Sequence, residues 1–212
     1  MRKMVLSRLD SISRGAYNTS QVLLGGPRMG LSEFSQSPGD RAERVQIYID
    51  GSNLYHALKT ECGSTKLDYF RFSKLLANGR KLIRLNYYTA TLDPTREPEP
   101  AKRHQKFLDS LRHVPYVSIK HRPLHYAKGL PLEKGVDILI ATDMLTGALR
   151  NCYDTAILVS GDGDFVEVLE EIKRAGKQVE NATFLSSRSD ALINAADLFI
   201  GLTKEGLKDC FR

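Results

Sequence analysis

The chain has 212 residues, of which 42% are hydrophobic and 26% charged, a composition typical of a folded domain of ordinary size. No apolar run approaches the roughly 18 residues needed to cross a bilayer, so we expect no membrane partner. The net charge of +6 is consistent with a polyanionic partner. The three cysteines are scattered, which argues against a CxxC zinc site and a disulfide framework and fits a reducing compartment.

Residues 1–43 differ from the rest of the chain, because they are rich in Ser, Gly, Pro and Asn and have no sustained hydrophobic period. We interpret them as a flexible N-terminal arm. The first 14 residues carry four basic side chains against one acid, which resembles an organelle transit peptide. One alternative is a disordered extension of the domain, and another is a start position placed too far upstream in the sequence. We therefore expect a cytoplasmic protein, with organelle targeting through the arm as the alternative.

From residue 44 onward, apolar runs alternate with amphipathic stretches. The runs predict strands at 45–50, 81–92, 116–122, 155–160, 178–184 and, unless it only leads into a tail, 198–202. The stretches between them predict helices at 53–61, 70–79, 101–113, 136–151, 164–176 and 189–197. This alternation indicates a three-layer α/β/α fold with a mainly parallel central sheet. The predicted domain covers 44–202, and 203–212 is a C-terminal tail that either mediates homo-oligomer formation or frays.

Acidic residues follow two of the predicted strands. Asp50 ends the first strand, and Asp162 and Asp164 come directly after the run 155–160. Ligands of such sheets bind beyond the carboxyl ends of the strands, so these side chains are expected to meet. The alternative is that Asp50, Asp164 and the nearby Asn53 only cap helices. The two glycines in Ser-Gly-Asp-Gly-Asp would leave room for a hydrated ion and a phosphate.

Two more acids lie on the predicted helix 136–151. A helical wheel groups its apolar residues on one side: Ile138, Ala141, Met144, Leu145, Ala148 and Leu149. Asp137 falls inside this arc, where the helix dipole compensates part of its charge and a metal ion would compensate the rest. Asp143 lies roughly 120° away, and its alternative is a surface acid or a salt-bridge partner.

Carboxylates that share one end of a sheet repel one another unless a cation joins them. Ligands that offer only oxygen, with no Cys or His nearby, suit a hard ion such as Mg²⁺ or Mn²⁺. The chemistry that corresponds to such a site is metal-assisted hydrolysis of a phosphodiester.

Three segments, IYIDGSNLYHAL, KGVDILIATDM and AILVSGDGDFVEVLEEIKRAGKQV, resemble in order and spacing the NYN domain of the LabA-like family, within the PIN-like nuclease group. The resemblance runs from about Val45 to about Leu202. It implies a PIN-like fold and a metal-dependent endoribonuclease. The residues at the positions implied to be catalytic are Asp50, Asn53, Asp137 and Asp162. Those at the positions implied to bind Mg²⁺ or Mn²⁺ are Asp50, Asp137, Asp143, Asp162 and Asp164.

A basic segment separates the first two acidic motifs. Its candidate RNA-binding residues are Lys102, Arg103, Lys106, Arg112, Lys120, Arg122 and Lys134. Tyr116 and Tyr126 are interleaved and could stack on bases, so we expect single-stranded RNA as the partner. The alternative is a solvated basic face.

Three other functions compete with a ribonuclease. A catalytically weak RNA-binding or scaffold module of the same fold is the main alternative. A nucleotidyltransferase would place a Gly-Ser pair shortly before its DxD, but the Gly-Ser pairs here lie far upstream. An aspartate-based phosphatase would place DxD directly after the first strand, where this chain has Asp50, Gly51 and Ser52. The complete set of acids favours the ribonuclease.

Overall fold

The computed structural model describes residues 21–23, 42–127, 130–132 and 135–211. Most of the segment interpreted as a flexible arm lies outside these ranges, and the interpretation stays a prediction there. The described part, β1 (Gln21–Leu23), is a short edge strand that pairs in parallel with β9 (Leu198–Leu202). The polar composition of the arm did not predict this strand.

Within the described residues, seven strands form one sheet in the order β1-β9-β8-β7-β2-β3-β4, and all neighbouring strands in it are parallel. The remaining strands are β2 (Arg44–Asp50), β3 (Lys81–Thr91), β4 (Val117–Pro123), β7 (Thr155–Val159) and β8 (Gln178–Phe184). All residues of β7 are buried, as its unbroken apolar run predicts for a central strand. The predicted parallel α/β architecture is confirmed.

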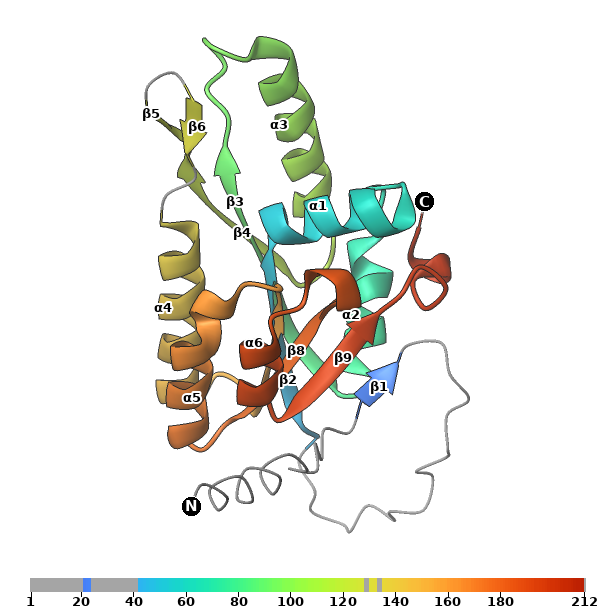
Figure 1. The fold of residues 1–212 in the computed structure, drawn as a ribbon, viewed down its shortest axis with the longest axis vertical. Helices are drawn as coiled ribbons and strands as arrows, with labels where there is room; N and C mark the ends of the chain where they lie inside the picture. The colour runs from blue at the N-terminus through green and yellow to red at the C-terminus, as the bar shows by residue number, and fades with distance from the viewer. Residues whose placement is uncertain (1–20, 24–41, 128–129, 133–134, 212) are drawn as a thin grey trace, which may run out of the picture.

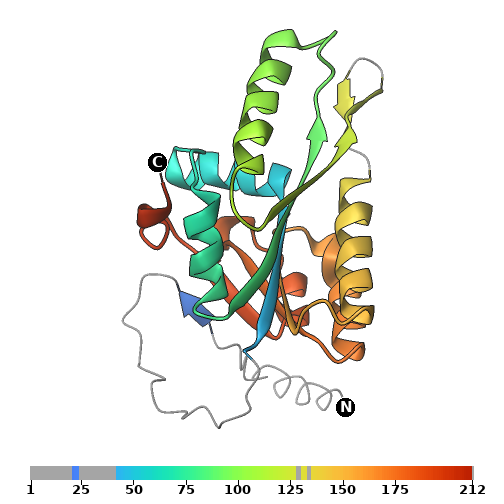
Figure 2. The ribbon, with the colours of Figure 1, turned by 180° about the vertical axis from the view of Figure 1, so that it is seen from behind.

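Helices cover both faces of this sheet and complete the three layers (Figure 1 and Figure 2). One face carries α1 (Gly51–Cys62), α2 (Tyr69–Ala77) and α3 (Pro98–Arg112). The other carries α4 (Val136–Leu149), α5 (Val166–Arg174) and α6 (Asp190–Ala195). Strand residues alternate between the two cores, so that Ile47 and Ile49 join the first and Tyr48 the second. Among the described residues, no helix combines the length and apolar character that a membrane crossing requires.

The orientation of α4 differs from the prediction. Ile140 and Met144 are fully buried against the sheet, whereas Ile138 is 72% exposed and Leu149 is 71% exposed. The predicted apolar side, which included the last two and enclosed Asp137, is therefore wrong, and Asp137 lies at the surface. Apolar residues occur almost all around this helix, so their pattern does not determine which side faces the sheet.

The end of β3, α3 and a small antiparallel hairpin project beyond the rest of the sheet at its carboxyl-terminal end (Figure 1 and Figure 2). The hairpin consists of β5 (His125–Ala127) and β6 (Leu130–Leu132), and the sequence analysis missed it. The Arg96 guanidinium lies 4.6 Å from the centre of the Tyr126 ring, whose hydroxyl donates to Glu97 Oε1 at 3.1 Å. These contacts tie the hairpin to the turn before α3.

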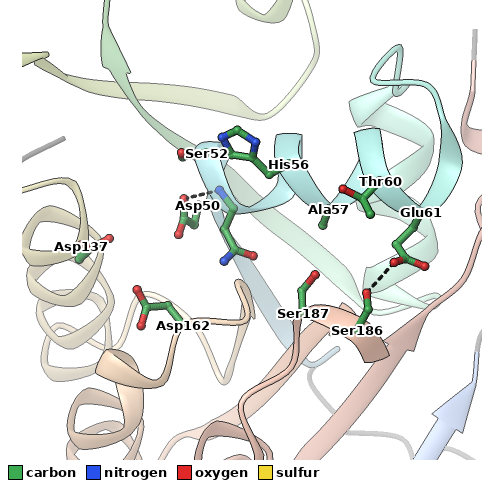
Figure 3. A pocket seen from close by; sticks show the side chains of 11 residues that line it. Asp50, Ser52, His56, Ala57, Thr60, Glu61, Asp137, Asp162, Ser186 and Ser187 are labelled. Carbon is green, nitrogen blue, oxygen red and sulfur yellow. Dashed lines mark hydrogen bonds between the residues drawn. The ribbon is translucent and has the colours of Figure 1, made fainter. Parts of the chain in front are cut away.

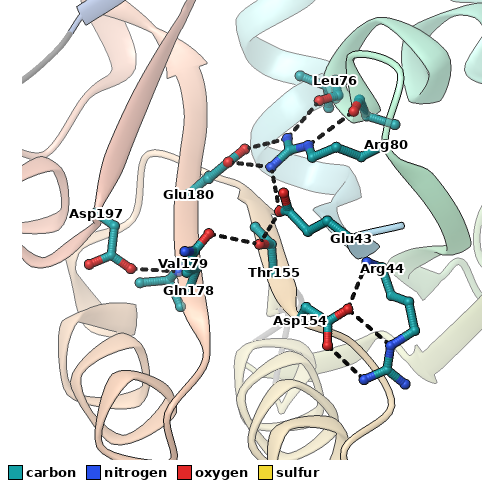
Figure 4. Close-up of polar contacts among 11 residues, drawn as sticks. Glu43, Arg44, Leu76, Arg80, Asp154, Thr155, Gln178, Val179, Glu180 and Asp197 are labelled. Carbon is teal, nitrogen blue, oxygen red and sulfur yellow. Dashed lines mark hydrogen bonds and ion pairs between the residues drawn. The ribbon is translucent and has the colours of Figure 1, made fainter. Parts of the chain in front are cut away.

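At the opposite end of the sheet, ion pairs join the segments that precede the strands (Figure 4). Arg80 donates two hydrogen bonds to the Glu180 carboxylate, at 2.6 and 2.8 Å. Arg44 donates to both Asp154 oxygens, and this hydrogen bonding lowers the pKa of Asp154 to about 2. The pairs connect β8 to the α2–β3 turn and the start of β2 to the start of β7, which fixes the strands relative to one another.

Residues 203–211 pack against the domain instead of forming a loose tail. They include the short helix η3 (Lys208–Cys210), in which Cys210 is 4% exposed, and Leu207 just before it is fully buried. The Asp68 N–H donates to the Cys210 carbonyl at 2.6 Å. The interpretation of this segment as a fraying tail is therefore wrong for the described residues.

Candidate active site

The acids after β2 and β7 lie side by side at the carboxyl-terminal end of the sheet. The two strands are hydrogen-bonded neighbours, so Asp50 and the loop 160–164 leave the sheet at the same place. Asp137 reaches this place from the first turn of α4. Figure 3 shows the carboxylates of Asp50, Asp137 and Asp162 grouped around a common space. The structure thus brings together three of the five predicted metal ligands.

Asp50 is fixed by hydrogen bonds on both of its carboxylate oxygens. Its side chain is buried at the end of β2, where Oδ1 accepts from the Asn53 N–H at 3.0 Å. Oδ2 accepts from the Ser160 hydroxyl at 3.2 Å. The first bond makes Asp50 the N-cap of α1. Helix cap and cavity wall, which the sequence offered as alternatives, are therefore two roles of one side chain.

The loop after β7 is held by three further contacts. The Ser160 hydroxyl accepts from the Asp162 N–H at 3.2 Å, and Asn53 Oδ1 accepts from the Gly161 N–H at 3.0 Å. The buried Asn181 amide on β8 donates to the Ser160 carbonyl at 2.8 Å. Asn181 Oδ1 has no hydrogen-bond partner in the described part of the chain. These bonds determine where Asp162 enters the cavity.

The carboxyl groups experience one another's charge. Burial is the largest cause that raises the pKa of Asp50, and the charges of Asp137 and Asp162 raise it further, against the hydrogen bonds from Asn53 and Ser160. The largest cause that raises the pKa of Asp137 is its partial desolvation, and the charges of Asp162 and Asp164 raise that pKa further. Mutual repulsion of this kind is what a bound cation relieves.

The acids form one end of an open cavity of about 500 Å³. Its lining comes from β2, α1, α4, the loop after β7 and the short helix η2 (Leu185–Ser187). The lining residues are Asp50, Ser52, Asn53, His56, Ala57, Thr60, Glu61, Asp137, Asp162, Ser186 and Ser187. The cavity therefore extends along α1, well beyond the acids themselves.

Sequence reasoning missed the part of the lining that lies away from the acids. His56 and Thr60 follow Asn53 at helical spacing on α1, so the i+3 and i+7 positions could have indicated them. Ser186 and Ser187 follow β8, and the rule that ligands bind beyond strand ends applies to that strand too.

The glycines of the loop after β7 do not have the role that was expected of them. A β-carbon added to Gly161 would lie 1.7 Å from the Ser187 carbonyl oxygen. The space beside this glycine is therefore filled by the backbone of η2, not left for an ion and a phosphate. A β-carbon on Gly163 would lie 3.0 Å from the Ser189 hydroxyl.

Two predicted ligands do not line the cavity. Asp143 Oδ2 accepts hydrogen bonds from the Tyr88 hydroxyl at 2.8 Å and from Lys120 Nζ at 2.5 Å. This is the salt-bridge alternative, and we leave Asp143 out of the proposed ligands. Asp164 is exposed on the short helix η1 (Gly163–Phe165), and its N–H donates to Asp162 Oδ1 at 3.0 Å. The negative charge of Asp164 contributes to the raised pKa of Asp137.

The predicted RNA-binding residues lie outside the cavity lining as far as the structure describes them. Lys102, Arg103 and Lys106 are exposed on α3, and Arg122 is exposed on β4. Arg112 pairs with Asp109 at 2.7 Å on α3, and Lys120 pairs with Asp143 as described above. Lys134 lies outside the described residues. Of the described candidates for RNA binding, those that make no ion pair thus lie on α3 and at the end of β4.

The donors at the acidic end fit a hard cation in their chemistry. Asp50, Asp137 and Asp162 offer carboxylate oxygens and face the same cavity. In the described ranges, no three His, Cys, Asp or Glu side chains form a group that would hold one ion directly. Mg²⁺ commonly binds through one or two carboxylates and keeps several waters, and this set suits that mode.

Comparison with known proteins places this geometry in a family. A family model described as NYN domain matches residues 44–203. A solved structure of a protein of unknown function from Vibrio parahaemolyticus is 26% identical, with a TM-score of 0.65, and the match covers 81% of this chain and 98% of that one. Nicotinic acid mononucleotide adenylyltransferase from Plasmodium falciparum matches at 12% identity and a TM-score of 0.34, over 76% of this chain and 74% of that one, which is too weak to support an inference. Among curated proteins, nothing matches.

Proposed function

The chain belongs to the NYN domain family, which is part of the PIN-like nuclease superfamily, and from this premise we propose that it is a metal-dependent endoribonuclease. The observation that carries the proposal is the grouping of Asp50, Asp137 and Asp162, from β2, α4 and the loop after β7, around one cavity. Within the family we assign it to the LabA-like group, because its three motifs resemble that group in order and spacing.

The three acids share one task in the proposed reaction. Asp50, Asp137 and Asp162 would hold Mg²⁺ or Mn²⁺. A bound ion of this kind lowers the pKa of a coordinated water and neutralises charge on the phosphate. Asp50 is immobilised before substrate arrives, because Asn53 and Ser160 hold its two oxygens. Asn53 also fixes the loop that carries Asp162, because its side-chain Oδ1 accepts from the Gly161 N–H, so one residue positions two of the proposed ligands.

The proposed substrate is single-stranded RNA. The exposed Lys102, Arg103 and Lys106 lie on α3 and the exposed Arg122 on β4. Helix α3 and the end of β4 extend past the carboxyl-terminal end of β2, where Asp50 lines the cavity. Cations at that position would bind the phosphates that flank the cleaved bond. The exposed Tyr116, which the sequence suggested as a face for a base, precedes β4 and lies beside the first half of β3, away from the end of the sheet that carries the cavity, so we leave it out of the proposed RNA site.

A catalytically weak RNA-binding module is the second candidate. It is favoured by the observation that the described acids do not form a group of three that would bind one ion directly. The difference between the two candidates is cleavage, because both would bind RNA through the same basic surface.

The proposal is tested with purified protein and single-stranded RNA in Mg²⁺, in Mn²⁺ and in chelator. We expect cleavage in at least one metal and none in chelator. Asp50→Asn and Asp162→Asn should lower kcat/KM by about 100-fold or more, since each removes a metal ligand. Asp209→Asn is the matched control, because Asp209 is exposed on η3 and is not among the residues that line the cavity.

Circular dichroism checks that the variants are folded. RNA that is bound but not cleaved in either metal would support the binding module. Equal activity of both variants and the wild type, or cleavage in chelator, would contradict the nuclease.

A further inference from the structure

The cavity has two chemically different ends. One end holds the carboxylates of Asp50, Asp137 and Asp162, and Figure 3 shows the other end along α1. That second end, which we call the hydroxyl end, is lined by Thr60, Glu61, Ser186 and Ser187. His56 lies between the two ends. The candidate reaction uses the acids alone, and the hydroxyl end has no role in it.

The cavity is larger than an ion site alone would need. It measures about 500 Å³ and, besides the acids, is lined by residues of α1 and η2. A volume of that size is in the range of small-molecule sites, so a part of the substrate other than the reacting phosphate fits into the hydroxyl end.

The hydroxyl end is held in place by contacts between different elements. Glu61 Oε1 accepts from the Ser186 hydroxyl at 2.7 Å, which joins the end of α1 to η2. The Ser187 carbonyl packs against Gly161 in the space that a β-carbon would occupy. The distance from these residues to the acids is therefore fixed by the fold.

The charge of the hydroxyl end excludes a phosphate and favours a sugar. No lysine or arginine is among the residues that line the cavity, and Glu61 adds a negative charge. A second phosphate in this position would be repelled. Hydroxyl groups and a carboxylate instead supply donors and acceptors of the kind that bind sugar hydroxyls. Apart from His56 the lining has no aromatic ring on which a base would stack.

We propose that the hydroxyl end binds the ribose of a nucleotide about two or three positions from the cleaved phosphodiester through its 2′-hydroxyl, with Glu61 as the acceptor and Ser186 as its partner. The distance follows from α1, which places Glu61 roughly 16 Å from Asp50 along the helix axis. A 2′-hydroxyl distinguishes RNA from DNA, so this subsite makes the protein select RNA. The inference rests on the proposed function, because it takes the acidic end as the place of cleavage.

The test uses the full chain and two oligonucleotides of one sequence, a single-stranded RNA and its all-deoxy equivalent. The value of kcat/KM in Mn²⁺ is measured on both, and binding of both in chelator is measured by fluorescence anisotropy. We expect the wild type to prefer RNA. Glu61→Ala and Ser186→Ala should each lower the RNA-to-DNA ratio by about tenfold, the effect of one lost hydrogen bond to a charged or hydroxyl partner.

Glu205→Ala and Ser110→Ala are the matched controls, because both residues are exposed and make local contacts away from the cavity. They should leave the ratio unchanged. A loss of equal size on RNA and DNA would show that Glu61 and Ser186 only support the fold and would overturn the inference, as would an unchanged ratio. If the wild type cleaves neither substrate, the nuclease proposal fails, and the binding ratio in chelator then decides the sugar subsite by itself.

Discussion

Gly161 joins three elements around the cavity. Its N–H donates to Asn53 Oδ1 on α1, and the side on which a β-carbon would stand is filled by the Ser187 carbonyl of η2. The loop after β7, the start of α1 and the turn after β8 therefore meet at one residue without a side chain. The geometry of both ends of the cavity depends on this contact.

Gly161→Ala should displace η2, because a β-carbon 1.7 Å from a carbonyl oxygen cannot be accommodated. We expect a loss of about 2–3 kcal/mol in the free energy of unfolding, the upper range for overpacking, together with reduced activity. Gly163→Ala is the control, since its β-carbon would meet the Ser189 side chain, whose hydroxyl lies at 3.0 Å and caps α6. Moving that hydroxyl costs about 1 kcal/mol, the value of one helix cap. Urea titration measures both. A loss as large for Gly163 as for Gly161 would contradict this explanation.

Single residues also show how far sequence reasoning reaches. Asp50 and Asp162 could be found because each directly follows a strand, and strand ends meet in a parallel sheet. The second role of Asp50, as a helix cap, was visible in the same position. After β7 the sequence offered Asp164 as the cap, whereas Asp162 is the residue that caps η1. The partner of Asp143 could not be found, because Lys120 lies 23 residues away and reaches it only in the folded protein.

At the level of elements, the order of strands and helices was predictable and the rotation of a helix was not. The alternation of apolar runs and amphipathic stretches predicted β2, β3, β4, β7, β8 and β9, together with the helices between them. For α4 the pattern failed, since nearly every side of the helix is apolar. The hairpin of β5 and β6 escaped notice because its strands are short and lie in a basic segment.

The contact between β8 and the α2–β3 turn depends on a buried ion pair. Glu180→Ala should lower the free energy of unfolding by about 2–3 kcal/mol, because it removes two hydrogen bonds of the largely buried Arg80 guanidinium and leaves it only Glu43 as a carboxylate partner. Arg80→Met combined with Glu180→Leu removes both charges and should cost clearly less. Urea unfolding of the two variants decides. Equal losses would mean that the packing of the side chains matters and not their charges.

On the scale of the whole molecule, the candidate metal ligands and the candidate RNA-binding residues lie in separate places. Asp50, Asp137 and Asp162 line the cavity, whereas the exposed Lys102, Arg103 and Lys106 lie on α3, which projects beyond the sheet. A polyanion bound along the projection would have its phosphates on the basic side chains and one of them over the acids. The acids would need the basic residues to hold the substrate, and the basic residues would need the acids for cleavage.

The salt dependence of RNA binding tests this arrangement. Each phosphate neutralised on a single strand contributes about 0.7 to the slope of log affinity against log salt. Arg103→Glu with Lys106→Glu should therefore weaken binding and reduce the slope by roughly 1.4 or more, whatever the RNA sequence. Lys81→Glu with Arg84→Glu is the matched control, since these exposed residues lie in the first half of β3, near the opposite end of the sheet. Anisotropy titrations at several salt concentrations measure the slope for both double variants. If the slope falls equally in both, net charge alone attracts RNA, and α3 has no special part in binding it.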